Sequence, residues 1–408
     1  MKPETRIYLD NAATTRTRSA ILNLSRSAEE IFWANPSSEN RDAFRAREAF
    51  EDARRRIARM IGAEKNGIAF VYFTGGATEG NNWAIKGAVE AWRRQRMAGM
   101  LGAVSSELPR VITDMGEHFS VLNTVLDLRD WSKCAATLLP LDPESGKVRT
   151  EDVVRELTED TAIVSVMMVN NETGARNPVE EIGAAVREWN RVNQTNVLFH
   201  VDAAQAVGKT RVNVREIGCD ILTASGHKIH AGKGNGFLYL SPEAYTEARV
   251  TPLLRGGGQQ RGLRPGTEDT VAALRIADAL EYELDDAKTG KIADMAEWIM
   301  RKVKEIPGSH INGEPEKACG IVSAWFDGVN SEALLMAAES NGVVFSAGSA
   351  CSAGEPEPSH VLRAMDAPEG ALYGTVRISA GALNTLEEVS NAMEILKRGV
   401  ERLRKAER

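Results

Sequence analysis

Three short segments contain side chains whose types and spacing could perform chemistry. The first, residues 74–82, reads Thr-Gly-Gly-Ala-Thr-Glu-Gly-Asn-Asn and joins an apolar strand-like run to a helical pattern. Backbone N–H groups at a helix start with so little side-chain bulk bind phosphate well, although a plain glycine-rich turn is the alternative interpretation. A P-loop or a dinucleotide fingerprint fits poorly, because Asn-Asn follows Gly80 and the segment has no GxGxxG.

The other two segments place an acid and a lysine after apolar strands. Asp202 follows Val197-Leu-Phe-His-Val201, at the edge where open α/β sheets bind ligands, although a lone acid there could also cap a helix. Lys228 ends Asp220-Ile-Leu-Thr-Ala-Ser-Gly-His-Lys, and by itself such a lysine is usually solvent-exposed. A phosphate site, a partner for a pyridinium nitrogen and a Schiff-base amine are together what pyridoxal phosphate requires. The combination predicts that cofactor.

The elements that must position these residues follow an α/β pattern. Short apolar runs alternate with amphipathic helical patterns, which is typical of parallel strands joined by crossover helices. Buried strands are expected at 68–73, 162–169 and 197–201, and the last helix is expected to begin with the capping box Thr385-Leu-Glu-Glu388. The glycines and proline of residues 256–266 suggest a boundary, with a large domain at 18–268 and a smaller α+β domain formed by 1–17 and 269–408.

The composition is that of an ordinary acidic globular chain. Of 408 residues, 43% are hydrophobic and 26% charged, which excludes disordered, collagen-like and membrane-protein classes. The net charge of -7 argues against binding nucleic acid through overall positive charge. The four cysteines form no CxxC pair, so neither a metal site nor a disulfide framework is expected. The first ten residues lack an apolar signal region, and no apolar run approaches the roughly 20 residues of a membrane helix, so a cytoplasmic protein is expected.

In its ordered motifs the chain resembles the cysteine desulfurases of the class V aminotransferase superfamily. The resemblance implies the aspartate-aminotransferase-like fold type I of pyridoxal-phosphate enzymes, with a mostly parallel central sheet in the large domain and a smaller α+β domain. The motifs span nearly the whole chain and are Tyr8-Leu-Asp-Asn-Ala-Ala-Thr-Thr15, Asn35-Pro-Ser-Ser38, Gly76-Ala-Thr-Glu79, Glu117-His118, Val169-Asn-Asn-Glu-Thr-Gly174, His200-Val-Asp-Ala-Ala-Gln205, Ser225-Gly-His-Lys228, Arg264-Pro-Gly-Thr267, Ser346-Ala-Gly-Ser-Ala-Cys-Ser352 and Arg377-Ile-Ser379.

The resemblance also implies how the cofactor is held. Lys228 would form the Schiff base and then act as acid and base at the substrate carbons, which suits an amine whose pKa its site lowers. His118 would stack on the ring, Asp202 would pair with the ring nitrogen, and Gln205 would contact the ring hydroxyl oxygen. The residues implied to hold the phosphate are the backbone of Ala77 and Thr78, the side chains of Ser225 and His227, and Thr267 from the neighbouring subunit of a homodimer.

For the substrate, L-cysteine, the resemblance implies three residues. Arg377 would bind the α-carboxylate, a bidentate task for which lysine is a poor substitute, and Asn171 would hold that carboxylate or the ring oxygen. The thiolate of Cys351 would attack the sulfur of the bound cysteine, keep it as a persulfide and leave alanine. The other cysteines, Cys134, Cys219 and Cys319, are interpreted as packing residues.

The segment around Cys351 resembles the long-loop group I, the iron–sulfur-assembly type, which delivers sulfur to partner proteins such as an iron–sulfur scaffold. Thiolated tRNA and DNA phosphorothioation are alternative destinations of the sulfur. A selenocysteine lyase or an aminotransferase of the same fold, and a scaffold that only binds partners, are alternative functions. The chain departs from the family at Asn40, where His is usual, and at Gln260, where an acid is common.

Overall fold

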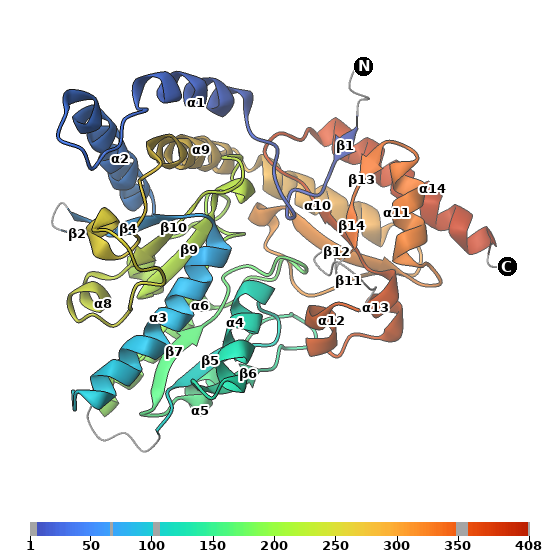
Figure 1. Ribbon diagram of the computed structural model, residues 1–408. Coiled ribbons are helices and arrows are strands. Elements are labelled where there is room, and N and C mark those ends of the chain that lie inside the picture. The colour runs from blue at the N-terminus through green and yellow to red at the C-terminus, as the bar shows by residue number, and fades with distance from the viewer. Residues whose placement is uncertain (1–5, 66–67, 101–106, 348–357, 407–408) are drawn as a thin grey trace.

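The computed structural model describes residues 6–65, 68–100, 107–347 and 358–406 of the chain (Figure 1). Within these residues, the larger sheet has seven strands in the order β4 (Val71–Thr74), β10 (Gly236–Leu240), β9 (Ile221–Ser225), β8 (Leu198–Asp202), β7 (Thr161–Ser165), β5 (Arg110–Asp114) and β6 (Ala135–Leu139). In this sheet, β10 runs opposite to the other six strands, which all run in the same direction. The predicted α/β fold with a mostly parallel sheet is therefore confirmed.

The strands of this sheet are apolar on both faces because helices cover both faces. On β8, Leu198 packs in a core with α3 (Ala77–Met97) and α4 (Phe119–Asp130), whereas its neighbour Phe199 points to the opposite core. That second core includes residues of α2 (Arg41–Met60), α6 (Val179–Asn193) and α9 (Thr270–Lys288). Successive side chains of a strand point to opposite faces, so a strand covered on both faces has apolar residues pointing in both directions.

The expected strands are present with somewhat different limits. The run at 68–73 is divided between β3 (Ile68–Ala69), which pairs with β2 (Glu64–Lys65), and β4. The run at 162–169 leaves the sheet after Ser165, and its last residues remain buried while Val169 forms a bridge with Arg176. The apolar character of this run therefore predicted its burial correctly. The strand itself ends at Ser165, before the end of the predicted run.

The smaller sheet lies on the other side of the molecule (Figure 1). Among the described residues it has four antiparallel strands in the order β11 (Ser309–Ile311), β12 (Ile321–Phe326), β15 (Val376–Ser379) and β14 (Ser346–Ala347). The helices α10 (Lys291–Lys304), α11 (Ser331–Glu339) and α14 (Leu386–Ala406) share its hydrophobic core. The first strand of the chain, β1 (Ile7–Tyr8), pairs in parallel with β13 (Val343–Val344), so the N-terminal segment joins this unit.

The packing of α9 bears on the domain boundary. The sequence places the boundary after residue 268, which would assign α9 to the small domain. The buried side chains of α9 belong instead to the core of the large sheet, and Figure 1 shows α9 beside α1 (Ser19–Ile31) and α2. We therefore keep two domains as a proposal and place the boundary between α9 and α10, at Gly290.

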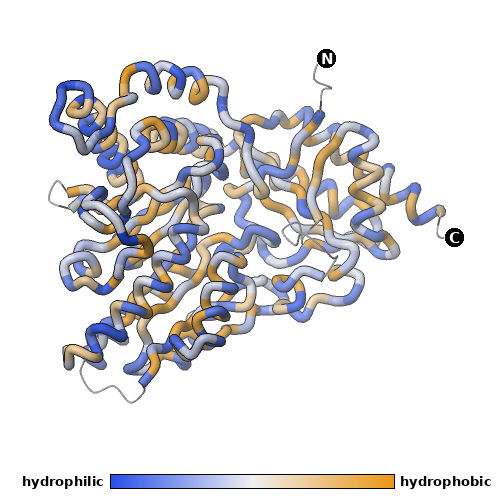
Figure 2. Tube along the Cα trace, in the orientation of Figure 1, coloured by the Kyte–Doolittle hydropathy of each residue, from blue (hydrophilic) through white to orange (hydrophobic). Residues whose placement is uncertain are grey.

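The remaining elements are short, and the end of the chain is a long amphipathic helix. The capping box at α14 is confirmed: the backbone N–H of Glu388 donates to Thr385 Oγ1 at 3.1 Å, and that of Thr385 donates to Glu388 Oε2 at 3.0 Å. Hydrophobic and hydrophilic stretches alternate along the outer helices in Figure 2.

No helix of the described residues has the length and apolar character to cross a membrane. The short helices are α5 (Thr150–Glu156), α7 (Val214–Ile217), α8 (Pro242–Thr246), α12 (His360–Ala364) and α13 (Glu369–Gly374).

Candidate active site

Four neighbouring parallel strands of the large sheet end beside one cleft. At their carboxyl ends, β5, β7, β8 and β9 lead into the segments that hold the candidate site residues. Ligands of open α/β sheets bind at this edge, and a cleft of about 750 Å³ lies there. The predicted residues that line it are Ala77, Thr78, His118, Asn171, Asp202, Gln205, Ser225, His227, Lys228 and Arg377.

Two predicted residues are not placed in this cleft. Thr267 is exposed and lines a smaller cavity of about 80 Å³, which shares Gly75 and Gly234 with the cleft. Cys351 lies outside the described residues. The roles of both remain predictions.

The start of α3 forms an end of the cleft that suits an anion. Gly76 precedes the helix with φ of 149°, a backbone conformation that favours glycine, and no side chain caps the helix. Uncapped N–H groups therefore remain at its first turn, near the side chains of Ser225 and His227. Burial, followed by the charges of Lys228 and Lys233, lowers the pKa of His227 to about 4, so its imidazole is neutral at pH 7.

Glu79 holds this turn against the segment that leads to Thr267. Its Oε2 accepts a hydrogen bond from the backbone N–H of Gly75 at 2.6 Å. Its carboxylate also binds Arg264, with Nε to Oε1 at 3.0 Å and Nη2 to Oε2 at 3.3 Å. One acid thus fixes the position of the anion-binding turn relative to the Arg264-Pro-Gly-Thr267 motif.

Asp202 and His118 belong to one buried hydrogen-bond network. Asn81 Nδ2 donates to Asp202 Oδ2 at 2.7 Å and to Ser120 Oγ at 2.8 Å, while the backbone N–H of Ala204 donates to Asp202 Oδ1 at 2.9 Å. His118 Nδ1 accepts the backbone N–H of Ser120 at 3.1 Å. Burial lowers the pKa of His118, and a neutral ring that accepts at Nδ1 carries its proton on Nε2. The network fixes the carboxylate and the imidazole relative to each other.

The N-terminal segment, residues 10–15, runs along the cleft and binds three of the candidate side chains. Lys228 Nζ donates to the carbonyl oxygens of Ala12 and Ala13 at 2.5 and 2.8 Å. Gln205 Nε2 donates to the same Ala12 oxygen at 2.9 Å. His227 Nδ1 lies 3.2 Å from Thr14 Oγ1. Two backbone carbonyl groups of this segment therefore fix the lysine, one of them also fixes the amide, and the Thr14 hydroxyl fixes the imidazole.

Arg377 has a buried guanidinium group whose Nε is without a partner among the described residues. Its side chain is 3% exposed; Nη1 donates to the Asn171 carbonyl oxygen and Nη2 to Asp10 Oδ1, both at 2.9 Å. Its buried Nε has no partner among the described residues. A buried unpaired donor is costly unless a ligand satisfies it, so Arg377 is suited to bind a carboxylate.

The described chain on either side of Cys351 is anchored beside the same residues. Before it, Ser346 of β14 lies opposite Arg377 in the antiparallel ladder. After it, the Ser359 hydroxyl donates to Glu172, the neighbour of Asn171. His360 Nε2 lies 2.9 Å from the carbonyl oxygen of Glu117, the neighbour of His118. Both flanks of the Cys351 segment thus begin at the wall of the cleft.

Glu172 should make stability depend on pH. Burial raises its pKa from 4.5 to about 7, so the folded chain binds a proton here that the unfolded chain has lost. This stabilising contribution is present below about pH 4.5 and declines as pH rises to 7, by up to about 3 kcal/mol. Glu172→Gln imitates the neutral acid and can still accept from Ser359. The advantage of this variant in thermal midpoint over the unmodified chain should therefore grow from pH 5 to pH 8; a constant difference would contradict the assignment.

The donor set of the cleft fits pyridoxal phosphate. An uncapped helix start can take the phosphate, and the buried Asp202 carboxylate can bind a protonated ring nitrogen. Lys228 lies in the same cleft and supplies the amine. The unused Nε of Arg377 then remains for a substrate carboxylate.

Several residues of the site are not predicted by the sequence analysis. Asn81 and Ser120 connect the predicted Asp202 and His118, and Asp10 is the counter-ion of Arg377. A signal for Asn81 existed, since it follows Ala77 and Thr78 by about one helical turn and so shares their face of α3. The sequence indicates Asp10 less clearly. A buried arginine needs an acidic partner, but the sequence does not say which acid it is.

The departures at Asn40 and Gln260 have structural reasons. Asn40 is the N-cap of α2, where its Oδ1 accepts the backbone N–H groups of Asp42 and Ala43 at 3.1 and 2.9 Å. Gln260 is buried and makes two hydrogen bonds to the backbone of Phe73, at 2.7 and 2.9 Å, so its amide supports strand β4. An acid could not donate the second of these bonds.

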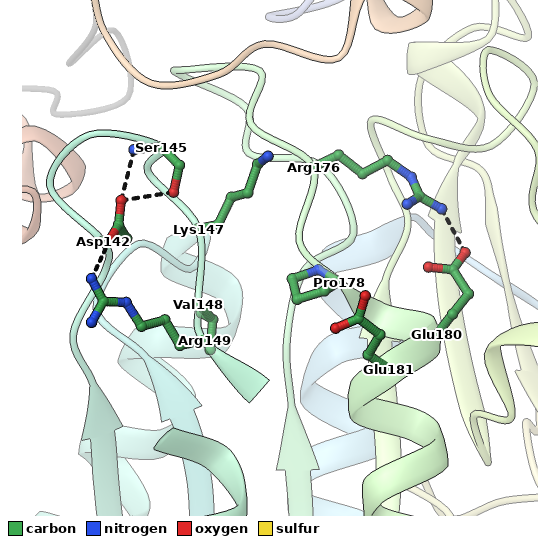
Figure 3. A pocket seen from close by; sticks show the side chains of 9 residues that line it. All are labelled: Asp142, Ser145, Lys147, Val148, Arg149, Arg176, Pro178, Glu180 and Glu181. Carbon is green, nitrogen blue, oxygen red and sulfur yellow. Dashed lines mark hydrogen bonds and ion pairs between the residues drawn. The ribbon is translucent and has the colours of Figure 1, made fainter. Parts of the chain in front are cut away.

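A second cavity, of about 470 Å³, lies away from these residues (Figure 3). Its cations are already paired, since Arg149 binds Asp142, Arg176 Nη2 lies 2.5 Å from Glu180 Oε1, and Lys147 binds Glu314. This cavity therefore offers no unpaired cation to an anionic ligand.

The cysteines in the described part of the chain behave as packing residues. Cys134, Cys219 and Cys319 are free and buried, as predicted. Burial raises the pKa of Cys134 to about 11 and that of Cys319 to about 12, so neither is a thiolate at pH 7. Within the described residues, no group of three His, Cys, Asp or Glu side chains could hold a metal ion.

Comparison with known proteins gives consistent relatives. Residues 7–391 match the family model described as aminotransferase class V. Cysteine desulfurase IscS of Methanosarcina thermophila is 33% identical over 401 residues, which cover 98% of this chain and 93% of that protein. A solved NifS-like protein has a TM-score of 0.83 and 27% identity, with 97% of this chain and 99% of the other covered. A structure described as SspA in complex with cysteine has a TM-score of 0.76 and 30% identity, covering 93% and 100%.

Proposed function

This chain belongs to the pyridoxal-phosphate-dependent cysteine desulfurases of aminotransferase class V, and we propose that it converts L-cysteine to L-alanine with Cys351 as the sulfur carrier. The observation that carries the proposal is Arg377, which lines the cleft that also holds Lys228 and Asp202 and whose buried Nε has no partner among the described residues. A guanidinium group at that place binds an amino acid by its carboxylate and so orients its other groups toward the lysine.

Each residue of the cleft then has a defined task. When bound, pyridoxal phosphate supplies an electron sink that allows bonds at the substrate carbons to break. Asp202 keeps a proton on the ring nitrogen, and Asn81 and Ala204 hold its carboxylate in place. Lys228 takes a proton from Cα and returns protons to the carbons, as a general base and acid. His118, neutral and protonated on Nε2, would cover one side of the ring.

The sulfur leaves the substrate through Cys351 in this proposal. The Cys351 thiolate would attack the substrate sulfur: a sulfur–sulfur bond forms, the substrate Cβ–S bond breaks, and the electron pair of that bond stays on Cβ. Proton return to Cβ completes alanine. Support comes from the flanks of the Cys351 segment, because Ser346 lies opposite Arg377 and Ser359 binds Glu172.

Arg377→Lys should raise the KM for L-cysteine by roughly 10- to 100-fold, the equivalent of about 1.5–3 kcal/mol for a charged hydrogen bond, with a smaller effect on kcat. Lysine keeps the charge but cannot form the planar two-donor contact with a carboxylate. Cysteamine, which lacks the carboxylate, provides the control in a competition assay. Its affinity should be equal in the variant and in the unmodified enzyme; an equal loss for both ligands would exclude a carboxylate contact.

We also propose that the chain acts as a cytoplasmic homodimer, with Thr267 reaching the phosphate of the neighbouring subunit. Support comes from large apolar side chains exposed on one flank, among them Trp33 at 73% and Phe44 at 53%. Ser37, between them in the chain, lies 3.4 Å from Glu268, so this flank adjoins the exposed Thr267. Sedimentation of the purified enzyme measures the dimer, and a monomer that retains full cofactor affinity would contradict it.

The sulfur acceptor is proposed to be a protein, of the kind that assembles iron–sulfur clusters. The IscS name of the relative from Methanosarcina thermophila is consistent with that class. Loading the enzyme with sulfur-labelled cysteine and separating it from candidate acceptors identifies the recipient. Label that moves to tRNA or DNA, without an acceptor protein, would overturn this part of the proposal.

The activity is tested with the cofactor-loaded enzyme, L-cysteine and a thiol reductant. Alanine and sulfide should form in equal amounts, and addition of a 2-oxo acid should not change that ratio. Transfer of the amino group to the 2-oxo acid, without sulfide, would identify an aminotransferase instead.

A further inference from the structure

Lys209 is a buried lysine to which the proposed reaction assigns no task. It is 6% exposed, and it lies one helical turn after Gln205, which is 4% exposed. Its Nζ donates to Gln205 Oε1 at 3.2 Å. Burial lowers its pKa; the charge of Glu283 opposes that shift, while the charge of Arg377 adds to it. Burying an amine is costly, so its place directly behind a cleft residue calls for a physical reason.

The hydrogen bonds of Gln205 determine which way its amide points. The carbonyl oxygen of Ala12 can only accept, so the NH₂ group of Gln205 must face it, at 2.9 Å. The amide oxygen then faces Lys209, which donates to it. One N–H of the NH₂ group is used by Ala12 and the other remains, while the residue lines the cleft. The pair of bonds makes Gln205 a donor toward any oxygen in the cleft.

From this geometry we propose that Lys209 is a positioning residue, which locks the Gln205 amide so that it donates a hydrogen bond to the ring hydroxyl oxygen of pyridoxal phosphate. The inference rests on the proposed function, because it takes the ring oxygen to lie at Gln205. Without Lys209, the amide oxygen loses its partner, and the side chain can rotate away from Ala12. The ring oxygen then loses a donor and keeps more negative charge.

The bound cofactor itself reports this change. More negative charge on the ring oxygen makes the nearby nitrogen of the Lys228–cofactor bond hold its proton more tightly. Lys209→Met should therefore raise the pH midpoint of the visible absorption of the bound cofactor by roughly half to one unit, the equivalent of one hydrogen bond. Gln205→Leu, which removes the donor directly, should raise it at least as much.

The double variant distinguishes positioning from simple loss of charge. If Lys209 acts through Gln205, Lys209→Met should cause no further shift in the Gln205→Leu background. Lys233→Met is the matched control, since Lys233 lines the cleft and has no hydrogen bond to Gln205 among those observed. Its shift should be the same in both backgrounds. Additive shifts for Lys209, or an unchanged midpoint in Lys209→Met, would overturn the inference.

A visible band in Lys209→Met also shows that the variant has folded and bound the cofactor. If the band is lost, Lys209→Leu, with a smaller side chain and no hydrogen-bond donor, serves for the same comparison. Absence of the band in the unmodified enzyme would instead contradict the proposed function. Failure of the inference therefore leaves a visible band with an unchanged pH midpoint in Lys209→Met. Failure of the proposed function leaves no visible band in the unmodified enzyme.

Discussion

Lys228→Ala is expected to remove the visible absorption of the bound cofactor and to lower turnover of L-cysteine on the order of 10⁴-fold. The amine lies at the carboxyl end of β9, in the cleft shared with Asp202 and Arg377, and the carbonyl oxygens of Ala12 and Ala13 hold it there. Its loss removes both the covalent attachment of the cofactor and the group that moves protons at the substrate carbons. Absorption spectra and single-turnover measurements of alanine check the two effects separately.

Lys233→Ala is the matched control for this prediction. Lys233 lines the same cleft and follows Lys228 closely in the chain, but its side chain is exposed. The control variant should keep the visible band. A band that persists in Lys228→Ala and disappears in Lys233→Ala would transfer the Schiff-base role to Lys233.

Cys351→Ala is expected to retain the cofactor and bind L-cysteine, but to reduce sulfide release to background and to form no protein persulfide. The physical reason is that the Cβ–S bond breaks only if a thiolate accepts the sulfur. Mass spectrometry of the enzyme after one turnover should show the added sulfur atom on the unmodified chain and not on the variant. Sulfide release at the normal rate from Cys351→Ala would exclude Cys351 as the carrier.

Cys134→Ala provides the comparison for that experiment. Cys134 is buried in the core beneath α3 and α4, and burial raises the pKa of its thiol to about 11. A thiol that stays protonated and unreachable cannot receive sulfur. The control variant should form the persulfide as the unmodified chain does, at a small cost in stability from the lost side-chain volume.

The sequence predicted those parts of the site that follow from strand ends. Asp202 and Lys228 are recognisable because an acid or a lysine directly after an apolar strand lies at the ligand edge of a parallel sheet. The N-terminal turn of α3 is recognisable because glycine and small residues follow a strand. The capping box at Thr385 and Glu388 is a local pattern, and the structure shows both of its hydrogen bonds.

Contacts between distant segments could not be predicted in this way. The pairing of Arg377 with Asp10 joins residues that are 367 positions apart, and no local pattern states it. The packing of α9 on the core of the large sheet could not be predicted for the same reason, since an apolar helix face does not say which core it enters. The cap at Asn40 is a local feature, because asparagine directly before a helix is a common N-cap.

The N-terminal segment has a consequence for the order in which the enzyme is made. Residues 10–15 are synthesised well before the residues that they bind, since Asp10 pairs with Arg377, 367 residues later in the chain. At roughly 5–20 residues per second, the segment waits about 20 to 70 seconds for this partner. During that time the carbonyl groups that hold Lys228 and Gln205 are not fixed by the small sheet. Complete cofactor binding is therefore expected only after synthesis of β15.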